Sequence, residues 1–126
     1  MKRSIYTSII LITVLIISGC SSTRDLFIGN WSAIQVSQAE GTSEEIISYN
    51  YWEVKSNEIL FSSFVQSIEN GIENKKFDET NRKKYGYTWN SKNGILINQK
   101  IYKVEIEKRE MTVSNDNMEI IFERVD

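Results

Sequence analysis

Hydrophobic and polar positions alternate along most of the chain after Gly29, as they do in strands that bury one face. In the clearest run, Tyr85, Tyr87 and Trp89 fall on one face, and small or charged residues fall on the other. Clusters of Asn, Ser and Gly separate such runs at short intervals, which is typical of tight turns. The pattern predicts about eight strand regions: 31–36, 46–54, 59–65, 84–89, 95–97, 102–106, 111–113 and 118–125.

Short strands joined mostly by tight turns predict an antiparallel up-and-down meander. An open meander would leave unpaired backbone groups at both edges, whereas closure into a barrel removes those edges. The chain contains no proline, in agreement with strands paired on both sides. We therefore predict an all-β fold that closes into a small barrel, with a small β-sandwich as the alternative. The polar stretch 66–81 is expected to be the longest loop, or a loop that holds one short turn of helix.

The first 19 residues follow a different pattern. A basic pair precedes an almost wholly apolar run at 5–17, and small residues lead from this run to Cys20. This order of charge, short apolar stretch and small residues is that of a secretory signal. The run is shorter than the roughly 20 residues that span a bilayer, which argues against a retained transmembrane anchor. We therefore expect residues 1–19 to be a cleaved signal peptide.

The segment Ile17-Ser18-Gly19-Cys20 resembles the lipobox of bacterial lipoproteins. The resemblance implies diacylglycerol on the Cys20 sulfur, cleavage before this residue and acylation of the new amino terminus. At about 0.8 kcal/mol per buried CH₂, two or three acyl chains would form a lasting membrane anchor. Residue 21 is Ser rather than Asp, and similarity to enteric sorting patterns then implies the outer membrane, facing the periplasm.

Composition narrows what the exported chain can do. Its 107 residues suffice for one small core, and we expect a lipidated tether leading into the barrel at 20–28 and one β domain at 29–126. Without the signal the chain has 13 basic and 17 acidic residues, a net charge of −4. It therefore lacks the excess of basic residues that binding to nucleic-acid phosphates requires. It contains no histidine and no cysteine except Cys20, which excludes an intramolecular disulfide and a histidine base. We expect no cofactor and no bound metal ion.

Carboxylates are the remaining candidates for chemistry. Glu105 and Glu107 alternate with apolar residues, as on the solvent face of a half-buried strand, while Glu44 and Glu45 fall in an expected loop. The segment 115–117 lacks the spacing of a calcium loop and is interpreted as a hairpin turn. We therefore interpret these carboxylates as solvent-exposed and predict that the protein is not an enzyme.

Two further features resemble the lipocalin superfamily. Gly29-Asn30-Trp31 opens the first predicted strand, and Arg124 lies two residues before the end of the chain. In that superfamily a Gly-x-Trp motif begins the first strand, and a basic residue on the last strand packs over the Trp ring. The resemblance implies that Gly29, Trp31 and Arg124 close the barrel, with a cation–π contribution of about 0.5–2 kcal/mol. The short chain without disulfides is most similar to the lipocalin-like domains of bacterial lipoproteins.

The aromatic residues are the most informative feature for binding. Facing inward, they would line a cavity for a small apolar ligand or lipid, or simply fill the core; facing outward, they would form a protein-binding surface. We expect a membrane-anchored, non-catalytic binding domain for a small apolar ligand or lipid. The alternative is a protein-binding envelope lipoprotein, such as an inhibitor or immunity protein, which binds through 66–81. The candidate ligand-binding residues are Tyr49, Tyr51, Tyr85, Tyr87 and Trp89.

Overall fold

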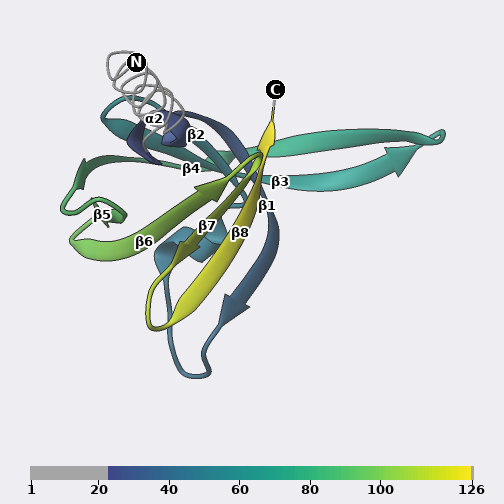
Figure 1. Ribbon diagram of the computed structural model, residues 1–126. Helices are drawn as coiled ribbons and strands as arrows, with labels where there is room; N and C mark the ends of the chain where they lie inside the picture. Colours follow the sequence, from purple (N-terminus) through teal and green to yellow (C-terminus); the bar gives the residue numbers. More distant parts are fainter. Residues whose placement is uncertain (1–22, 126) are drawn as a thin grey trace, which may run out of the picture.

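The computed structural model describes residues 23–125 of the 126-residue chain. These residues form a closed antiparallel barrel of strands β1 to β8, in which β1 pairs with both β2 and β8 (Figure 1). The predicted all-β meander and its closure are therefore confirmed, and the architecture agrees with the lipocalin-like barrel that the sequence resembles. The expected export signal, the lipobox and Cys20 lie outside the described residues.

Within residues 23–125, two short helices accompany the strands. The helix α2 (Thr23–Phe27) precedes β1, and the 3₁₀ helix η1 (Glu45–Ser48) lies between β1 and β2. The strands are β1 (Gly29–Gln38), β2 (Tyr51–Val54), β3 (Glu58–Glu69), β4 (Ile72–Trp89), β5 (Gly94–Ile97), β6 (Lys100–Glu107), β7 (Glu110–Ser114) and β8 (Met118–Val125). Most predicted strands correspond to an observed strand, but β3 and β4 are much longer than expected.

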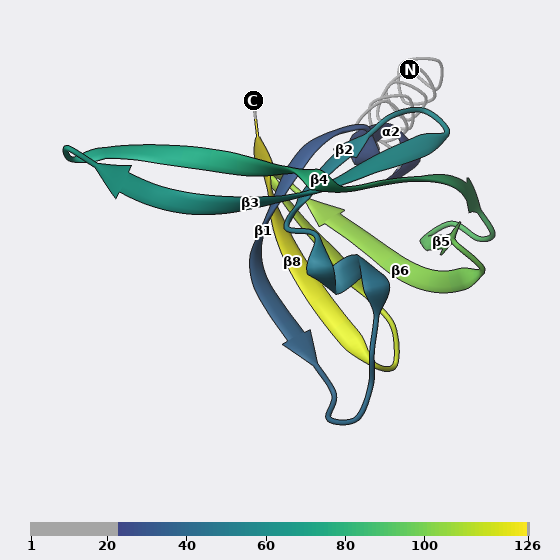
Figure 2. The same cartoon turned by 180° about the vertical axis from the view of Figure 1, so that it is seen from behind.

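The strand predicted at 46–54 is wrong in its first half. Residues 45–48 form η1, the short blue coil in Figure 2, and β2 begins only at Tyr51. The β-branched residues Ile46 and Ile47 favoured a strand. Tertiary packing overrides that preference, because Ile46 is 3% exposed and Tyr49 is 5% exposed, and both join the hydrophobic core.

The prediction of a long loop at 66–81 is also wrong. Strands β3 and β4 continue beyond the barrel wall as a two-stranded ribbon, which projects from the body of the protein in both views (Figures 1 and 2). The strands meet at Asn70 and Gly71, whose φ angles of 54° and 77° suit a primed hairpin turn. The sequence shows no clear alternation of apolar and polar residues here, because a ribbon with solvent on both faces has no side that must be apolar. We call residues 64–77 the arm.

The barrel interior is filled by buried side chains from every strand. The fully buried ring of Trp52 lies 4.9 Å from the Phe61 ring and 4.6 Å from the Phe122 ring between centroids. Burying one large apolar side chain contributes about 1.5–3 kcal/mol, so this core stabilises the barrel without a disulfide. The largest fully buried side chains are Trp31, Trp52, Phe27, Phe61, Phe122, Ile59, Ile95, Ile97, Met111, Ile120, Val104 and Val113.

Candidate functional site

Helix α2 closes one end of the barrel. Phe27 is fully buried, and its ring meets Tyr87 and Trp89 edge-on at centroid distances of 5.3 and 5.4 Å. The indole Nε1 of Trp31 donates a hydrogen bond of 2.9 Å to the carbonyl oxygen of Phe27. The helix is therefore a plug for this end, held by the first strand and by the aromatic end of β4.

Arg124 joins the last strand to the same end. Its Cζ lies 4.3 Å from the centroid of the Trp31 ring, and Arg124 and Trp31 are directly paired between β8 and β1. The guanidinium also donates hydrogen bonds to the carbonyl oxygens of Leu26 and Ile28. At Gly29, with φ of 146°, a Cβ atom would collide with this guanidinium. The structure thus brings Gly29, Trp31 and Arg124 together where the first strand, β1, meets the last strand, β8.

A buried carboxylate holds the opposite end. Glu44 is 6% exposed, so the expectation of a solvent-exposed Glu44 is wrong. Burial raises the pKa of Glu44, but four donated hydrogen bonds outweigh it and hold this pKa below the ordinary value of 4.5. Strand β6 and the β7–β8 turn supply these donors, which a linear sequence does not reveal. They are Lys100 Nζ at 3.0 Å, Tyr102 Oη at 3.1 Å, Asn115 Nδ2 at 3.2 Å and Asn117 Nδ2 at 3.4 Å.

The neighbouring Glu45 connects η1 to β4. It is exposed, and Tyr85 Oη donates to its two carboxylate oxygens at 2.8 and 2.9 Å. This hydrogen bond stabilises the neutral phenol, so the pKa of Tyr85 is raised. Tyr49 follows η1 and is buried, with its ring 5.7 Å from the Phe61 ring. Tyr49 and Tyr85 therefore help to fasten η1 across this end of the barrel.

The five aromatic candidates consequently lie in three places. Tyr85, Tyr87 and Trp89 all pack against the core, as their alternation predicts, but the last two contact the α2 plug. Tyr49 and Tyr85 lie at the η1 end, and Tyr51 lies at the base of the arm. The structure does not bring the five together around one cavity.

One buried tryptophan of the core has an unsatisfied hydrogen-bond donor. Within residues 23–125, Trp52 Nε1 is buried without a hydrogen-bond partner. Such a group costs about 1–3 kcal/mol, which the burial of the surrounding rings offsets.

An aromatic cluster lies at the base of the arm. The ring of Tyr51 is 5.2 Å from the Phe77 ring and 6.3 Å from the Phe64 ring, and the two Phe rings are 5.7 Å apart. A pocket of about 230 Å³ adjoins this cluster, and it combines apolar surface with one acidic and one basic side chain. The residues that line the pocket are Tyr51, Glu53, Leu60, Phe61, Ser62, Phe77 and Arg82.

Beyond this cluster the arm exposes large apolar side chains. Val65 and Ile68 are each 71% exposed, and Ile72 is 64% exposed. Asn50 ends the pairing between β2 and β3, because its side chain donates to the Phe64 carbonyl at 3.0 Å and accepts from the Phe64 N–H at 2.9 Å. The arm therefore leaves the barrel wall at Phe64 and continues as a ribbon that only its own two strands form.

Sequence reasoning missed the arm, although one signal was present. Asn70-Gly71 is a strong two-residue hairpin turn, and a β-branched residue lies close to it on each side, Ile68 before it and Ile72 after it. The mixed charges on either side favoured a loop instead. A turn dipeptide between β-branched residues was thus a better guide than the overall polarity of the stretch.

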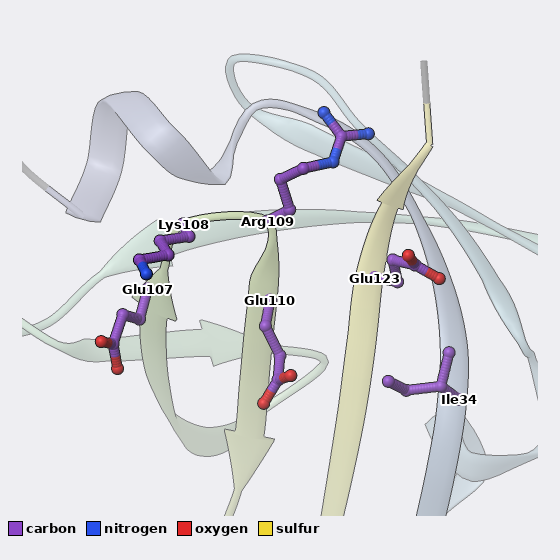
Figure 3. Close-up of a pocket in the computed structure, with 6 residues that line it drawn as sticks. All are labelled: Ile34, Glu107, Lys108, Arg109, Glu110 and Glu123. Carbon is purple, nitrogen blue, oxygen red and sulfur yellow. The ribbon is translucent and has the colours of Figure 1, made fainter.

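A larger surface hollow lies where the β6–β7 turn meets β8 and β1 (Figure 3). Its carboxylates oppose one another in the sheet, because Glu107 pairs with Glu110 and Glu110 pairs with Glu123. Within residues 23–125, no group of three or more His, Cys, Asp or Glu side chains is placed to hold a metal ion. The hollow is an acidic surface, lined by Ile34, Glu107, Lys108, Arg109, Glu110 and Glu123.

Comparison of the chain with protein-family models, curated proteins and solved structures finds no match. The architecture therefore defines the class: a small closed β-barrel with an aromatic core, a helical plug at each end and one projecting arm. In the part of the chain that the structure describes, no helix has the length and apolar character needed to span a membrane.

Proposed function

We propose that this chain is a lipid-anchored, non-catalytic binding protein of the cell envelope, and that its arm binds a protein partner. The lipobox-like segment that ends at Cys20 supports the anchor. The observation that carries the binding proposal is the arm itself, which presents Val65, Ile68 and Ile72 to solvent outside the barrel. Exposed apolar side chains on a projecting element are typical of protein-interaction surfaces.

The interior offers less support for a small apolar ligand. Trp31, Trp52 and Phe61 are at most 1% exposed and fill the barrel with protein atoms. A ligand that entered from either end would have to displace α2 or separate Glu44 from its four donors. The arm, in contrast, is accessible without any rearrangement, which favours the protein-binding function over the ligand-binding one.

The pocket at the base of the arm adds an anchoring point for the same partner. Its volume of about 230 Å³ suits one apolar side chain, and Leu60 and Phe77 supply apolar contacts. Glu53 and Arg82 at the same pocket offer hydrogen bonds to a neighbouring backbone. An apolar anchor surrounded by polar groups is the common arrangement of an interface hot spot.

Photo-crosslinking in intact cells tests this function. A photoreactive amino acid replaces Ile68 on the arm, and the matched control replaces Ile101, which is 57% exposed on the barrel wall. We expect a discrete protein adduct from the Ile68 position, and none from the Ile101 position. A folded protein that gives no adduct from the arm refutes the proposed function.

The anchor is tested separately by mass spectrometry of the mature amino terminus. We expect an acylated Cys20 as the first residue. An unmodified Cys20, or an intact Met1, refutes the anchor and leaves the crosslinking result as an independent test of binding.

A further inference from the structure

The two edges of the arm differ in charge. On β4, Glu73, Lys75 and Lys76 follow the turn, whereas β3 carries no charged residue from Phe64 to Ile68. Charged side chains, lysine above all, protect an edge strand from pairing with another chain, and an uncharged edge lacks this protection. The β3 edge is therefore the edge of the arm at which a strand from another chain can pair.

The hydrogen bonds of Asn50 show which backbone groups of β3 point outward. Asn50 occupies both the N–H and the carbonyl of Phe64, so these groups point away from β4. Alternate residues of an antiparallel strand direct their backbone groups to the same side. Gln66 and Ile68 therefore also present their N–H and carbonyl groups away from β4, and β2 pairs with β3 only as far as Ser62.

We propose that a second copy of this chain occupies this edge, with the two β3 strands antiparallel about a two-fold axis at Ser67. The inference rests on the proposed function, since it names the partner of the arm. In this register Gln66 exchanges two backbone hydrogen bonds with the partner's Ile68, and Ile68 does the same with the partner's Gln66. The part of the β3 edge that is open to a partner runs from Phe64, which Asn50 contacts, to the turn at Asn70. The two-fold axis places Phe64 of one copy opposite Asn70 of the other.

The side chains are compatible with the same register. The Ile68 side chains of the two copies become diagonal neighbours, Ser67 faces its own equivalent, and Val65 faces the partner's Glu69, so no like charges are opposed. Two marginal ribbons become one four-stranded sheet, which is the size that a sheet needs for independent stability. Because the arm projects clear of the barrel, the two barrels lie at opposite ends of this sheet (Figures 1 and 2). A single self-complementary patch is the usual basis of a two-fold dimer.

Disulfide trapping in the full-length protein tests the register. Ser67 and its equivalent form a non-hydrogen-bonded pair, with Cα atoms about 4.5 Å apart, which suits a disulfide. The control is Asn74→Cys, because Asn74 is opposite Ser67 on β4 and lies three strand spacings, about 14 Å, from its own equivalent. After mild oxidation in membranes, we expect Ser67→Cys to give about ten times more covalent dimer than Asn74→Cys. Equal yields overturn the inference.

Two proline variants test the hydrogen bonds in the Ser67→Cys background. Gln66→Pro removes an outward N–H from β3 and spares the ladder with β4, whereas Lys75→Pro makes the equivalent change on the opposite edge. We expect Gln66→Pro to abolish the covalent dimer and Lys75→Pro to retain it. The reverse result overturns the inference.

The mass of the photo-adduct at Ile68 separates the two proposals. An adduct of twice the chain mass supports both. An adduct with a different protein, together with no Ser67→Cys dimer, retains the binding function and refutes self-pairing. The absence of any adduct and of any dimer refutes both.

Discussion

Replacing Glu44 by glutamine tests how the η1 end of the barrel is held. Glutamine keeps the size of the side chain but replaces one carboxylate oxygen by an NH₂ group. One oxygen accepts from Lys100 and Tyr102, and the other accepts from Asn115 and Asn117. Whichever oxygen is replaced, the new NH₂ group faces two groups that donate to Glu44 in the wild type, and at least one of them loses its acceptor.

The geometry sets the size of the expected loss. A hydrogen bond to a charged group contributes about 1.5–3 kcal/mol; Glu44→Gln breaks at least one of the four, and the remaining ones no longer have a charged acceptor. The Lys100 side chain is 52% exposed, so water compensates for part of this loss. We expect Glu44→Gln to reduce the free energy of unfolding by about 2–3 kcal/mol at pH 7, measured by denaturant unfolding. The control Glu45→Gln changes an exposed carboxylate and should cost less than about 1 kcal/mol.

The same substitution predicts a pH dependence. The pKa of Glu44 in the folded protein lies below its ordinary value of 4.5. The stabilisation by Glu44 is therefore complete above that ordinary value and is lost as the pH falls through the lowered folded-state pKa. The advantage of the wild type over Glu44→Gln should shrink in acid. The reasoning is refuted if Glu44→Gln lowers the free energy of unfolding by less than about 0.5 kcal/mol at pH 7. It is also refuted if the difference in unfolding free energy between wild type and variant is unchanged in strong acid.

Three further substitutions, one of them with a control, separate the barrel from the arm. Trp31→Ala should cost about 3–5 kcal/mol in denaturant unfolding, because it empties a fully buried indole position; a loss under about 1 kcal/mol would contradict its role in closing the barrel. Arg124→Leu should cost about 2 kcal/mol, since it removes the cation–π contact and the hydrogen bonds to two carbonyls, while Arg82→Leu on the surface should cost under about 1 kcal/mol. Ile68→Ser should change stability by less than about 0.5 kcal/mol, because this side chain is largely exposed; a larger loss would place it in a folded core.

The fold could be predicted from the sequence because the alternating apolar positions record which face each strand buries. Tyr85, Tyr87 and Trp89 pack against the core as their spacing indicates, and the eight strands close as the meander predicts. The position of Trp31 beneath Arg124 agrees with what the resemblance to the lipocalin superfamily implies for these two residues. Local periodicity is sufficient for the strands, because each of them has one side that must leave water; the contact between Trp31 and Arg124 has no such periodic signal.

The candidate site depended on contacts between distant segments. The residues that donate hydrogen bonds to Glu44 lie 56 to 73 positions away in the sequence. The sequence around Glu44 therefore contains no signal of its burial or of its lowered pKa. The arm escaped prediction for the opposite reason: a ribbon with two solvent faces buries no side and shows no clear period of two. Only the tertiary structure shows that Val65 and Ile68 lie outside the core, because exposure depends on where the barrel ends and the free hairpin begins.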